Sequence, residues 1–556
     1  MRADAKAAVV LGVESVPDGL ASGLLAGLNP VAGLYAYMVG AATGALFTST
    51  AFMAIQGTGA MAIIVADVGH LQSSDDPTRA LVTLSVMTGL TMAIAGYLKL
   101  GLVLRFVSNS VMTGFISAVG VNIVLGQLGD FTGYYSDGEN RVLRALDTLA
   151  HPGRLDLWTV CVGAATIALI VWLRRTRLGA MGLVVAIIAG SCIAGVVSAF
   201  DHNIQLVGNL AEVPNSLPTP SLPQLGDIVV LFLPAMSLAF VGLVQGAGVS
   251  AGFSNPDGSR GDESKDFVAQ GVGNIAAGLF KGMPVGGSMS ATSLITSAGA
   301  RSRWALVYTG AVMAVVIVLF AGVVEYVAMP ALAGLLIVIG IETVKPSELV
   351  SVYRTGSVQA TVMSVTFVLT LLIPLQFSVL IGVGMSMILY IVSQASKLDT
   401  RRLVFAEDGG IDEVSPPIDV PPGEVVVLQP YGSLFFASVG MFEAELPTVT
   451  EASVRSVVIL RFRGKPDVGV TLLEVLNRYS HSLEAVGSKL VIVTDSDRIF
   501  DQLVQSGIAE NIGAEDLYRG TSRLTATVRR AADDGAAWIA AKEAEGDRPT
   551  IDETDE

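Results

Sequence analysis

The chain has 556 residues, of which 52% are hydrophobic and only 15% charged, and its mean hydropathy is +0.62. This composition is too apolar for an ordinary soluble protein and predicts a chain that crosses a membrane several times. The net charge of −15 owes much to the acidic end "EAEGDRPTIDETDE", which indicates a solvated tail and argues against a nucleic-acid-binding surface.

The first predicted element is an apolar segment that begins close to the N-terminus. Arg2 and Lys6 precede "AAVVLGV", as in a signal peptide, but Glu14, Pro17 and Asp18 interrupt any apolar region of that kind. The apolar pattern then resumes in "GLASGLLAGL". We therefore predict a retained first membrane span and no cleaved signal.

Further apolar segments follow along the chain. A spanning helix needs roughly 20 apolar residues, and segments near this length lie at residues 7–27, 32–50, 51–68, 80–98, 102–127, 157–173, 179–200, 227–252, 267–282, 302–323, 327–343, 357–375 and 376–396. A further piece, Pro284 to Gly299, is less apolar and too short to span as a full helix. Counted as a half-helix, it brings the prediction to about fourteen elements.

The basic residues predict the orientation of these spans. With the N-terminus in the cytoplasm, the predicted cytoplasmic loops contain Lys99, Arg105, Arg174, Arg175, Arg177, Arg260, Lys265, Arg301, Arg303, Lys345 and Arg354, and Lys397, Arg401 and Arg402 follow the last span. The predicted external loop 201–226 has no lysine or arginine, as the positive-inside rule requires. Arg141, Arg144 and Arg154 are a partial exception. We predict a multi-pass protein of the cell membrane, with both ends of its membrane part in the cytoplasm.

Two short segments in corresponding places of the two halves are interrupted by glycine and small hydroxyl residues. They are "QGTGAMA", from Gln56 to Ala62, and "PVGGSMSATSLITSAG", from Pro284 to Gly299. Paired interruptions of this kind mark transport sites. Half-helices that begin near Thr58 and Ser288 would point unpaired N–H groups at an anion, and the hydroxyls of Thr58, Ser288 and Ser290 would add donors. The alternative is that these small residues only allow helices to pack closely.

The sequence shows no cluster of residues that would form a metal site, a cofactor site or a catalytic site. The histidines and cysteines are widely separated, at His70, His151, His202, His481, Cys161 and Cys192. We find in the sequence no metal-ligand spacing, no phosphate-binding loop and no nucleophile paired with a base. We expect no metal, no cofactor and no enzymatic activity.

The membrane part resembles the SulP/SLC26 family of anion transporters in three motifs. They are "VPDGLASGLLAGLNPVAGLYA" in the first span, "GTGAMA" in the third and "GNIAAGLFKGMPVGGSMSATSLITSAGARS" before the eleventh. The resemblance implies fourteen segments in two intertwined inverted repeats of seven, a core domain that moves against a gate domain, and an anion between the third and tenth helices. The binding residues that it implies are Asp18, Gln56, Gly57, Thr58, Gly59, Gln245, Ser288, Met289, Ser290 and Ala291.

Three of these positions bear on coupling and charge. Asp18 lies in the middle of the first span, where an ionisable group is expensive and marks a functional site by default; a capping or structural role is the alternative. Gln245 stands where many bacterial relatives carry an acidic residue linked to cation coupling, so its neutral amide argues against sodium coupling and leaves an interhelical hydrogen bond as the alternative. Ala291 stands where some relatives carry arginine, so dipoles and hydroxyls alone would hold the anion.

The carboxyl-terminal part predicts a separate α/β domain. After the Pro-rich stretch "VSPPIDVPPGE", the strands "VVVLQ", "SVVILRF" and "KLVIVT" alternate with the helical patterns "TLLEVLNRYSHSLEAVG" and "DRIFDQLVQSG". This part resembles the cytoplasmic STAS domain of SulP proteins. The predicted division is a transport domain at 1–396, a linker at 397–423, the STAS domain at 424–535 and an acidic tail at 536–556.

The STAS resemblance also carries an expectation about regulation. Relatives that act as anti-anti-sigma factors place a phosphorylated Ser or Thr after an Asp that follows the central strand. This chain keeps Asp467 but continues with Val468 and Gly469. We therefore expect a scaffolding or dimer-supporting domain and no phosphorylation switch at this place.

Together these patterns predict secondary transport of a small inorganic anion, sulfate-like or bicarbonate, by alternating access in a lipid bilayer. Proton symport through Asp18 and a homodimeric assembly are part of this prediction. Two alternatives stay open. A nucleobase–proton symporter would share the fold, although a base-binding carboxylate would then be expected near Gln245. An anion sensor or scaffold would report occupancy to the STAS domain without flux.

Overall fold

The computed structural model describes residues 1–100, 108–138, 140–176, 181–200, 202–210, 215–406, 410–465, 467–521, 523 and 525–546. The chain divides into two compact units, Met1–Ser386 and Met387–Glu556. Each unit has a hydrophobic core of its own.

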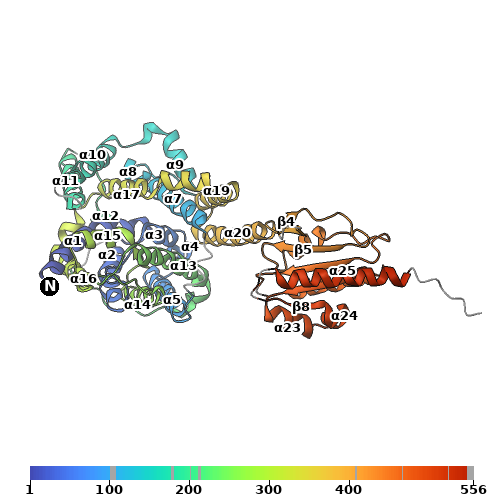
Figure 1. Cartoon of the computed structure of the whole chain (residues 1–556). Coiled ribbons are helices and arrows are strands. Elements are labelled where there is room, and N and C mark those ends of the chain that lie inside the picture. The colour runs from blue at the N-terminus through green and yellow to red at the C-terminus, as the bar shows by residue number, and fades with distance from the viewer. Residues whose placement is uncertain are drawn as a thin grey trace, which may run out of the picture. The chain divides into compact units, whose positions relative to one another are not determined.

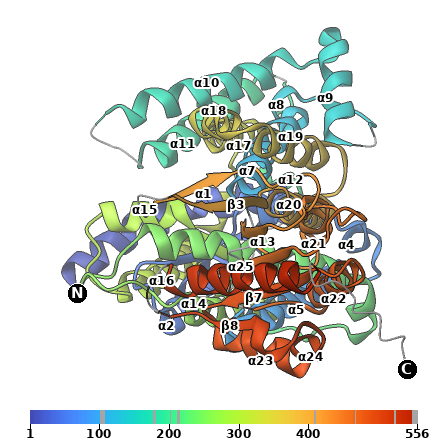
Figure 2. The ribbon, with the colours of Figure 1, turned by 45° about the vertical axis from the view of Figure 1, so that its right-hand side comes forward.

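The helices of the first unit form two groups, and each group takes segments from both halves of the unit (Figure 1, Figure 2). The first group contains α1 (Arg2–Leu25), α2 (Pro30–Phe47), α3 (Gly59–Ala66), α4 (Gly69–Ser73), α5 (Pro77–Tyr97), α13 (Ile228–Gly252), α14 (Glu263–Leu279), α15 (Met289–Ser297) and α16 (Trp304–Glu325). The second contains α7 (Asn109–Gly126), α8 (Leu128–Thr132), α9 (Arg141–Ala150), α10 (Leu157–Arg174), α11 (Met181–Ser198), α17 (Met329–Thr343), α18 (Pro346–Thr355), α19 (Ser357–Leu372) and the start of α20 (Leu375–Ala395).

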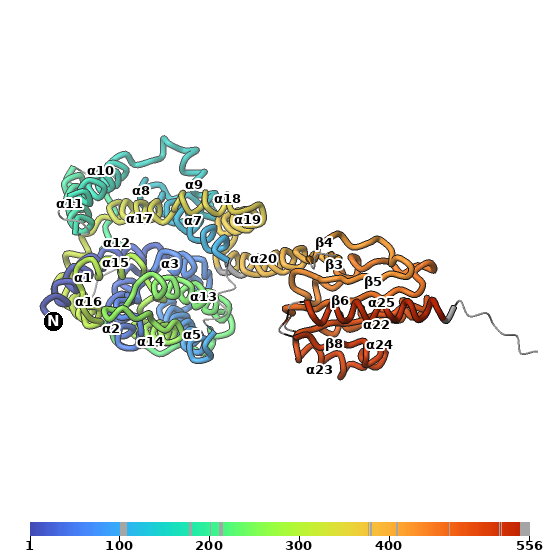
Figure 3. The backbone as a smooth tube through the Cα atoms, viewed as in Figure 1, coloured from blue at the N-terminus to red at the C-terminus, as the bar shows by residue number. Residues whose placement is uncertain are grey.

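Most helix contacts lie within one group or the other. The main contacts between the groups are those of α1 with α11 and α17 and of α3 with α7. Short segments complete the unit, namely η1 (Pro152–Arg154), α12 (Val207–Leu210) and η2 (Leu225–Asp227). The tube in Figure 3 shows the two groups as separate layers of helices.

Nine helices among the described residues are long and apolar enough to cross a membrane. The segment at 51–68 is different, because an extended stretch precedes α3, a helix of only eight residues. The piece at 284–299 likewise becomes a short strand followed by the nine-residue helix α15. The span predicted at 102–127 begins in residues outside the described part, and its remainder forms α7.

Glycine allows the helices of the first group to pack backbone against backbone. A Cβ atom at Gly33 on α2 would lie 1.9 Å from the carbonyl oxygen of Gly19 on α1. A Cβ atom at Gly89 on α5 would lie 2.6 Å from the carbonyl oxygen of Gly271 on α14. Small residues at these contacts are typical of helix packing in membranes. The approach of α1 to α2 also brings their polar side chains within reach of each other.

A buried carboxylate holds the loop between α2 and the third segment. Asp266 on α14 is fully buried. Its Oδ1 accepts hydrogen bonds from the Thr48 hydroxyl at 2.7 Å, the Ser49 N–H at 2.6 Å and hydroxyl at 2.9 Å, and the Thr50 N–H at 3.0 Å. Its Oδ2 accepts from the hydroxyls of Thr50 at 2.5 Å and Ser250 at 2.7 Å. Charge-assisted bonds of this kind are stronger than neutral ones, so this cluster fixes the loop.

Replacing Asp266 with alanine should destabilise the first unit strongly, because six donors lose their acceptor inside the protein. We expect the unfolding free energy to fall by about 3 kcal/mol or more. Thermal unfolding of the purified protein measures the change. Glu263→Ala, at the start of the same helix, is the matched control. Equal melting temperatures for the two variants would show that the cluster contributes little.

The second unit is a six-stranded sheet with helices on both faces. The strand order is β4 (Ile411–Val414), β3 (Asp399–Phe405), β5 (Val425–Tyr431), β6 (Val457–Phe462), β7 (Lys489–Thr494) and β8 (Leu517–Arg519). β3 pairs antiparallel with β4 and β5, and the strands from β5 to β8 are parallel. The helices are α21 (Val439–Glu445), α22 (Val470–Glu484), α23 (Asp497–Gln505), α24 (Ile508–Ile512) and α25 (Ala526–Gly546).

Two apolar clusters show which helices cover which face of this sheet. On one face, Leu476 of α22 and Leu503 of α23 pack into the cluster that contains Leu460 of β6. On the other face, Val528 and Ile539 of α25 pack into a second cluster. Figure 1 shows α25 lying along the sheet.

The three strands and two helices predicted for this part are confirmed as β5, β6, β7, α22 and α23. The segment predicted as a linker, 397–423, differs from the prediction because it contains β3 and β4, which extend the sheet. The acidic tail predicted at 536–556 also differs, since α25 continues to Gly546; residues 547–556 lie outside the described part. Both differences arise because these segments lack a continuous apolar run: β4 has no buried residue, and α25 mixes charged residues with alanines.

Candidate functional site

Two short strands connect the interrupted segments inside the first helical group. β1 (Ala54–Gln56) and β2 (Gly286–Ser288) pair antiparallel, with Ile55 opposite Gly287. The helices that follow them, α3 and α15, therefore leave the pair in opposite directions. The N-terminus of each helix faces the strand pair, and the pairing satisfies backbone groups that would otherwise be unbonded at membrane depth.

Each half-helix begins at a capping hydroxyl. Thr58 is the N-cap of α3 and its Oγ1 accepts from the Met61 N–H at 3.3 Å. Ser288 is the N-cap of α15 and its Oγ accepts from the Ala291 N–H at 3.3 Å. Each cap satisfies one of the free N–H groups of the first turn and leaves others available. The two helix starts are those that the sequence predicts.

Asp18 on α1 lies beside the backbone that leads into α3. The Tyr37 hydroxyl on α2 is 2.9 Å from Asp18 Oδ2, 2.8 Å from the carbonyl oxygen of Gly57 and 2.9 Å from Ser22 Oγ. A tyrosine hydroxyl has one hydrogen, so it donates to only one of these oxygens at a time. Tyr37, which is 1% exposed, therefore joins the carboxylate of α1 to the start of the half-helix.

Gln245 and Gln56 hold the same region from two other sides. The Thr58 hydroxyl donates to Gln245 Oε1 of α13 at 2.9 Å. The side-chain amide of Gln56 donates to Ser15 Oγ of α1 at 2.9 Å. The α3 side of the site thus takes polar contacts from α1, α2 and α13.

Two buried amides of α14 hold the second strand in place. Gln270 Oε1 accepts from the Gly287 N–H at 3.0 Å. Asn274 bonds both backbone groups of Val285, since its Oδ1 accepts from the N–H at 2.8 Å and its Nδ2 donates to the carbonyl at 2.6 Å. Both amide side chains are fully buried. They fix the backbone from which α15 starts.

The α15 side presents hydroxyls and one apolar side chain at its N-terminus. Ser290 is exposed, and its Oγ lies 3.2 Å from Ser288 Oγ. Met289 is also exposed, at 49%, whereas Ala291 is buried and offers its backbone only. Gly57 is buried and Gly59 partly buried on the opposite side of the strand pair. A Cβ atom at Gly57 would lie 2.6 Å from the ring of Tyr37, so this position has no room for a side chain.

The structure thus places the predicted site residues in two clusters. Asp18, Gly57, Thr58 and Gln245 gather at the start of α3, and Gln56 lies just before them. The other cluster is Ser288 to Ala291 at the start of α15, and the β1–β2 pair joins the two. Within the described part of the chain, neither cluster has a hydrogen bond or ion pair with lysine, arginine or histidine.

This arrangement suits a small anion chemically. Two helix N-termini each contribute roughly half a positive charge and free N–H donors. Hydroxyls of Thr58, Ser288 and Ser290 lie at the same termini. The carboxyl group of Asp18 would repel an anion when ionised and would not do so when protonated.

Several residues of the site were not predicted from the sequence. They are Ser15, Ser22, Tyr37, Gln270 and Asn274, which hold Gln56, Asp18 or the second strand. Their common signal is a polar side chain inside an apolar span, where unpaired polar groups are costly and therefore mark a contact. The position of such a polar residue along its helix does not show which residue it contacts.

Comparisons with known protein families agree with these observations. The model of the sulfate permease family matches residues 1–366, and the model of the STAS domain matches residues 416–530. A Bacillus subtilis protein named "Putative sulfate transporter YvdB" is 24% identical over 534 residues, which cover 94% of this chain and 97% of that protein. The "Bicarbonate transporter BicA" of Picosynechococcus is 25% identical over 422 residues, which cover 73% of each chain.

The fold also matches a solved structure along almost its whole length. The murine anion transporter Slc26a9 in its inward-facing state superposes with a TM-score of 0.82 at 18% identity, covering 97% of this chain and 92% of that one. The first unit is thus a helical membrane transporter fold, and the second unit contains a STAS domain.

Proposed function

Because the chain belongs to the sulfate permease family, we propose that it is a secondary transporter of a small inorganic oxyanion, sulfate-like or bicarbonate. The observation that carries this proposal is the pair of half-helices whose N-termini face one hydrogen-bonded strand pair. The anion would bind at Thr58 and Gly59 on one side and at Ser288, Met289, Ser290 and Ala291 on the other.

The choice of substrate class rests on the chemistry of this site. N–H and hydroxyl donors without a fixed cation favour a small, charged and strongly hydrogen-bonding ligand. Relatives of this chain carry names that refer to sulfate and to bicarbonate. A nucleobase transporter would be expected to carry a base-binding carboxylate near Gln245, but the α13 residue at the start of α3 is this neutral amide, and the nearby carboxylate of Asp18 comes from α1. The oxyanion is therefore the better fit.

Alternating access would follow from movement of the first helical group, as the core, against the second, as the gate. The two interrupted segments meet antiparallel, which supports an inverted repeat of seven segments with its pseudo-two-fold axis near the strand pair. The predicted orientation places both ends of the membrane part in the cytoplasm. The face that carries Asp67, at the end of α3, then lies outside the cell.

Proton coupling would reside at Asp18. Burial disfavours the charged form of a carboxyl group in a poorly hydrated place, and a nearby anion disfavours it further by repulsion. Anion and proton would therefore bind with positive coupling, and the linkage is reciprocal. Tyr37 would link the protonation of Asp18 to the binding site. When Asp18 is protonated, the Tyr37 hydroxyl can donate its hydrogen to the carbonyl oxygen of Gly57 instead.

Uptake of labelled anions into proteoliposomes tests the transport proposal directly. A panel of sulfate, bicarbonate, chloride and fumarate would identify the substrate, and an imposed proton gradient would test the coupling. We expect accumulation of one oxyanion that depends on this protein. Binding without flux would support the alternative of an anion sensor that signals through the STAS domain.

Removing the second unit should affect assembly more than selectivity. We propose that the protein is a homodimer supported by its STAS domain. Truncation after Leu398, just before β3, should therefore weaken the dimer or lower expression while the ranking of substrates stays the same. Size-exclusion chromatography with light scattering and the uptake panel measure the two effects. Truncation after Gly546, which keeps α25, is the matched control. A changed substrate ranking after Leu398 truncation would contradict this expectation.

A further inference from the structure

An ion pair links the two helical groups at the far end of the half-helix α3. Asp67 is the C-cap of α3 in the first group, and its Oδ1 lies 2.8 Å from Arg141 Nη2 at the start of α9 in the second group. Its Oδ2 accepts a hydrogen bond of 3.2 Å from the backbone N–H of Leu375, the first residue of α20. The Asp67 and Arg141 side chains are only 14% and 17% exposed. One carboxylate of the first group thus has two partners in the second.

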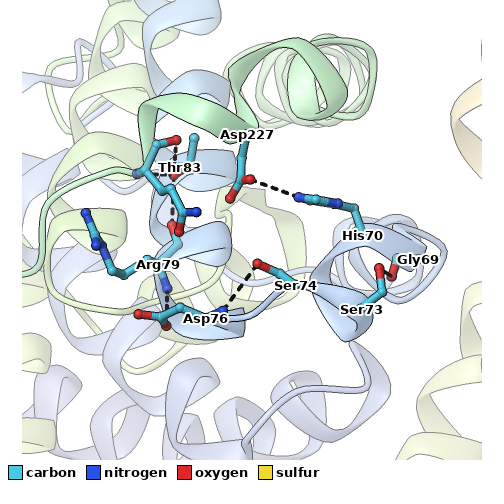
Figure 4. Close-up of polar contacts among 9 residues, drawn as sticks. Gly69, His70, Ser73, Ser74, Asp76, Arg79, Thr83 and Asp227 are labelled. Carbon is cyan, nitrogen blue, oxygen red and sulfur yellow. Dashed lines mark hydrogen bonds and ion pairs between the residues drawn. The ribbon is translucent and has the colours of Figure 1, made fainter.

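The first helical group holds Asp67 firmly. Only eight helical residues separate it from Thr58 at the candidate binding site. The next helix, α4, is fixed by a contact of 3.0 Å between His70 Nε2 and Asp227 Oδ1, and Asp76 caps α5 by accepting from the Arg79 N–H at 3.0 Å (Figure 4). Asp67 is therefore attached to the same short helix as the candidate binding site, whereas its two partners belong to the second group.

Arg141 also borders a cavity that contains a second carboxylate. This cavity measures about 220 Å³ and lies within the second group, between the end of α7, α8 and α9. Asp130 of α8 is part of its lining together with Arg141 and Arg144. The Tyr135 hydroxyl lies 2.7 Å from Asp130 Oδ1 and 2.9 Å from Gln205 Oε1, so its one hydrogen can be donated to this carboxylate and hold it in place. The arginine thus has room to turn, and an acidic partner lies on its own side of the boundary.

We propose that Asp67 and Arg141 are positioning residues of the transport cycle and that Arg141 exchanges Asp67 for Asp130 when the two helical groups separate at this face. The proposal rests on the proposed function, in which the first group moves against the second. While the pair is formed, the external end of α3 is fastened to the gate. When it opens, Asp130 receives the arginine, so that the guanidinium group keeps a carboxylate partner in both arrangements.

The energetics require such a second partner. Breaking this largely enclosed ion pair without a replacement partner would leave the arginine uncompensated, which would slow every cycle. With two carboxylates available, the arginine has two discrete arrangements, which is what a transition between two states needs. Removing Asp67 should then favour the separated state, and removing Asp130 should favour the fastened one. If the two carboxylates had a purely structural role, their removal would not shift the balance between the separated and the fastened state in opposite directions.

Distance measurement between the two groups tests this prediction without any substrate. Nitroxide labels at Thr78→Cys on α5 and Leu146→Cys on α9 would report separation of the face in nanodiscs, in a Cys161→Ser/Cys192→Ser background. All four positions are exposed. We expect Asp67→Asn to raise the ratio of long to short distances by at least about fivefold. Asp130→Asn should lower it, and Asp75→Asn, an exposed carboxylate on the same face, should leave it unchanged.

The charge-swapped variant Asp67→Arg/Arg141→Asp is the control for misfolding of the single variants. It should restore the short distance that either single change removes. Equal distance ratios for the original protein and Asp67→Asn, or shifts in the same direction for Asp67→Asn and Asp130→Asn, would overturn the proposal. Anion uptake, measured separately, tests the proposed function. Failure of uptake with opposite distance shifts would therefore reject the transported anion and keep the exchange of partners.

Discussion

Replacing Ser290 with tryptophan is expected to abolish anion uptake while the protein stays inserted and folded. Ser290 is exposed at the start of α15, so a large ring there has room in the fold. The ring would cover the free N–H groups of the helix N-terminus, to which the anion would bind. Thr58→Trp should have the same effect at the start of α3, where the hydroxyl contacts Gln245. Uptake into proteoliposomes and a melting curve of the purified variant give the two readings.

Ser293→Trp is the matched control for Ser290→Trp. Ser293 is also exposed on α15 but lies about one turn further along, beyond the helix start. It should keep uptake and the original melting temperature. Uptake at the original rate in both the Ser290 and Thr58 variants would move the binding site away from the half-helices.

Asp18→Asn should separate anion binding from proton-driven uptake. Asparagine has the shape of a protonated aspartic acid but cannot exchange a proton. Anion binding or exchange should therefore survive, whereas uptake driven by an inward proton gradient should fall to background. Radiolabelled exchange, with anion on both sides and no gradient, and gradient-driven uptake measure the two activities in the same proteoliposomes.

Two further variants show how specific this effect is. Glu14→Gln, one turn earlier on α1, is the control and should keep gradient-driven uptake. Tyr37→Phe removes the hydroxyl between Asp18 and Gly57, and it should weaken the proton dependence while leaving exchange measurable. Gradient-driven uptake at the original level in Asp18→Asn would reject Asp18 as the coupling residue and turn attention to Glu14 or to uncoupled transport.

The sequence predicted the elements whose signal is local. The starts of α3 and α15 at Thr58 and Ser288 follow from glycine and hydroxyl residues that interrupt apolar segments. The strands of the STAS domain follow from short apolar runs such as "KLVIVT", which is β7. Each of these signals is contained within about ten residues of chain, so no knowledge of packing is needed to recognise it.

The features that the sequence did not predict depend on contacts between distant segments. Tyr37 reaches Asp18 because Gly19 and Gly33 let α1 and α2 approach each other closely. The sequence alone does not show that these two glycines face each other. The antiparallel β1–β2 pair joins residues more than 200 positions apart and has only three residues in each strand, too few to show an alternating pattern. Asp67 and Arg141 likewise become partners only once both helical groups have folded.

The strand pair has a consequence for how the protein would discriminate between ions. Backbone hydrogen bonds between β1 and β2 hold the N-termini of α3 and α15 at a fixed separation, and Gln270 and Asn274 anchor the second strand from behind. A site whose two sides are bonded to each other would keep its dimensions during the proposed movement of the first helical group against the second. An ion that fits from outside would then fit equally well from inside, so the preference among competing anions should be the same for import and for export.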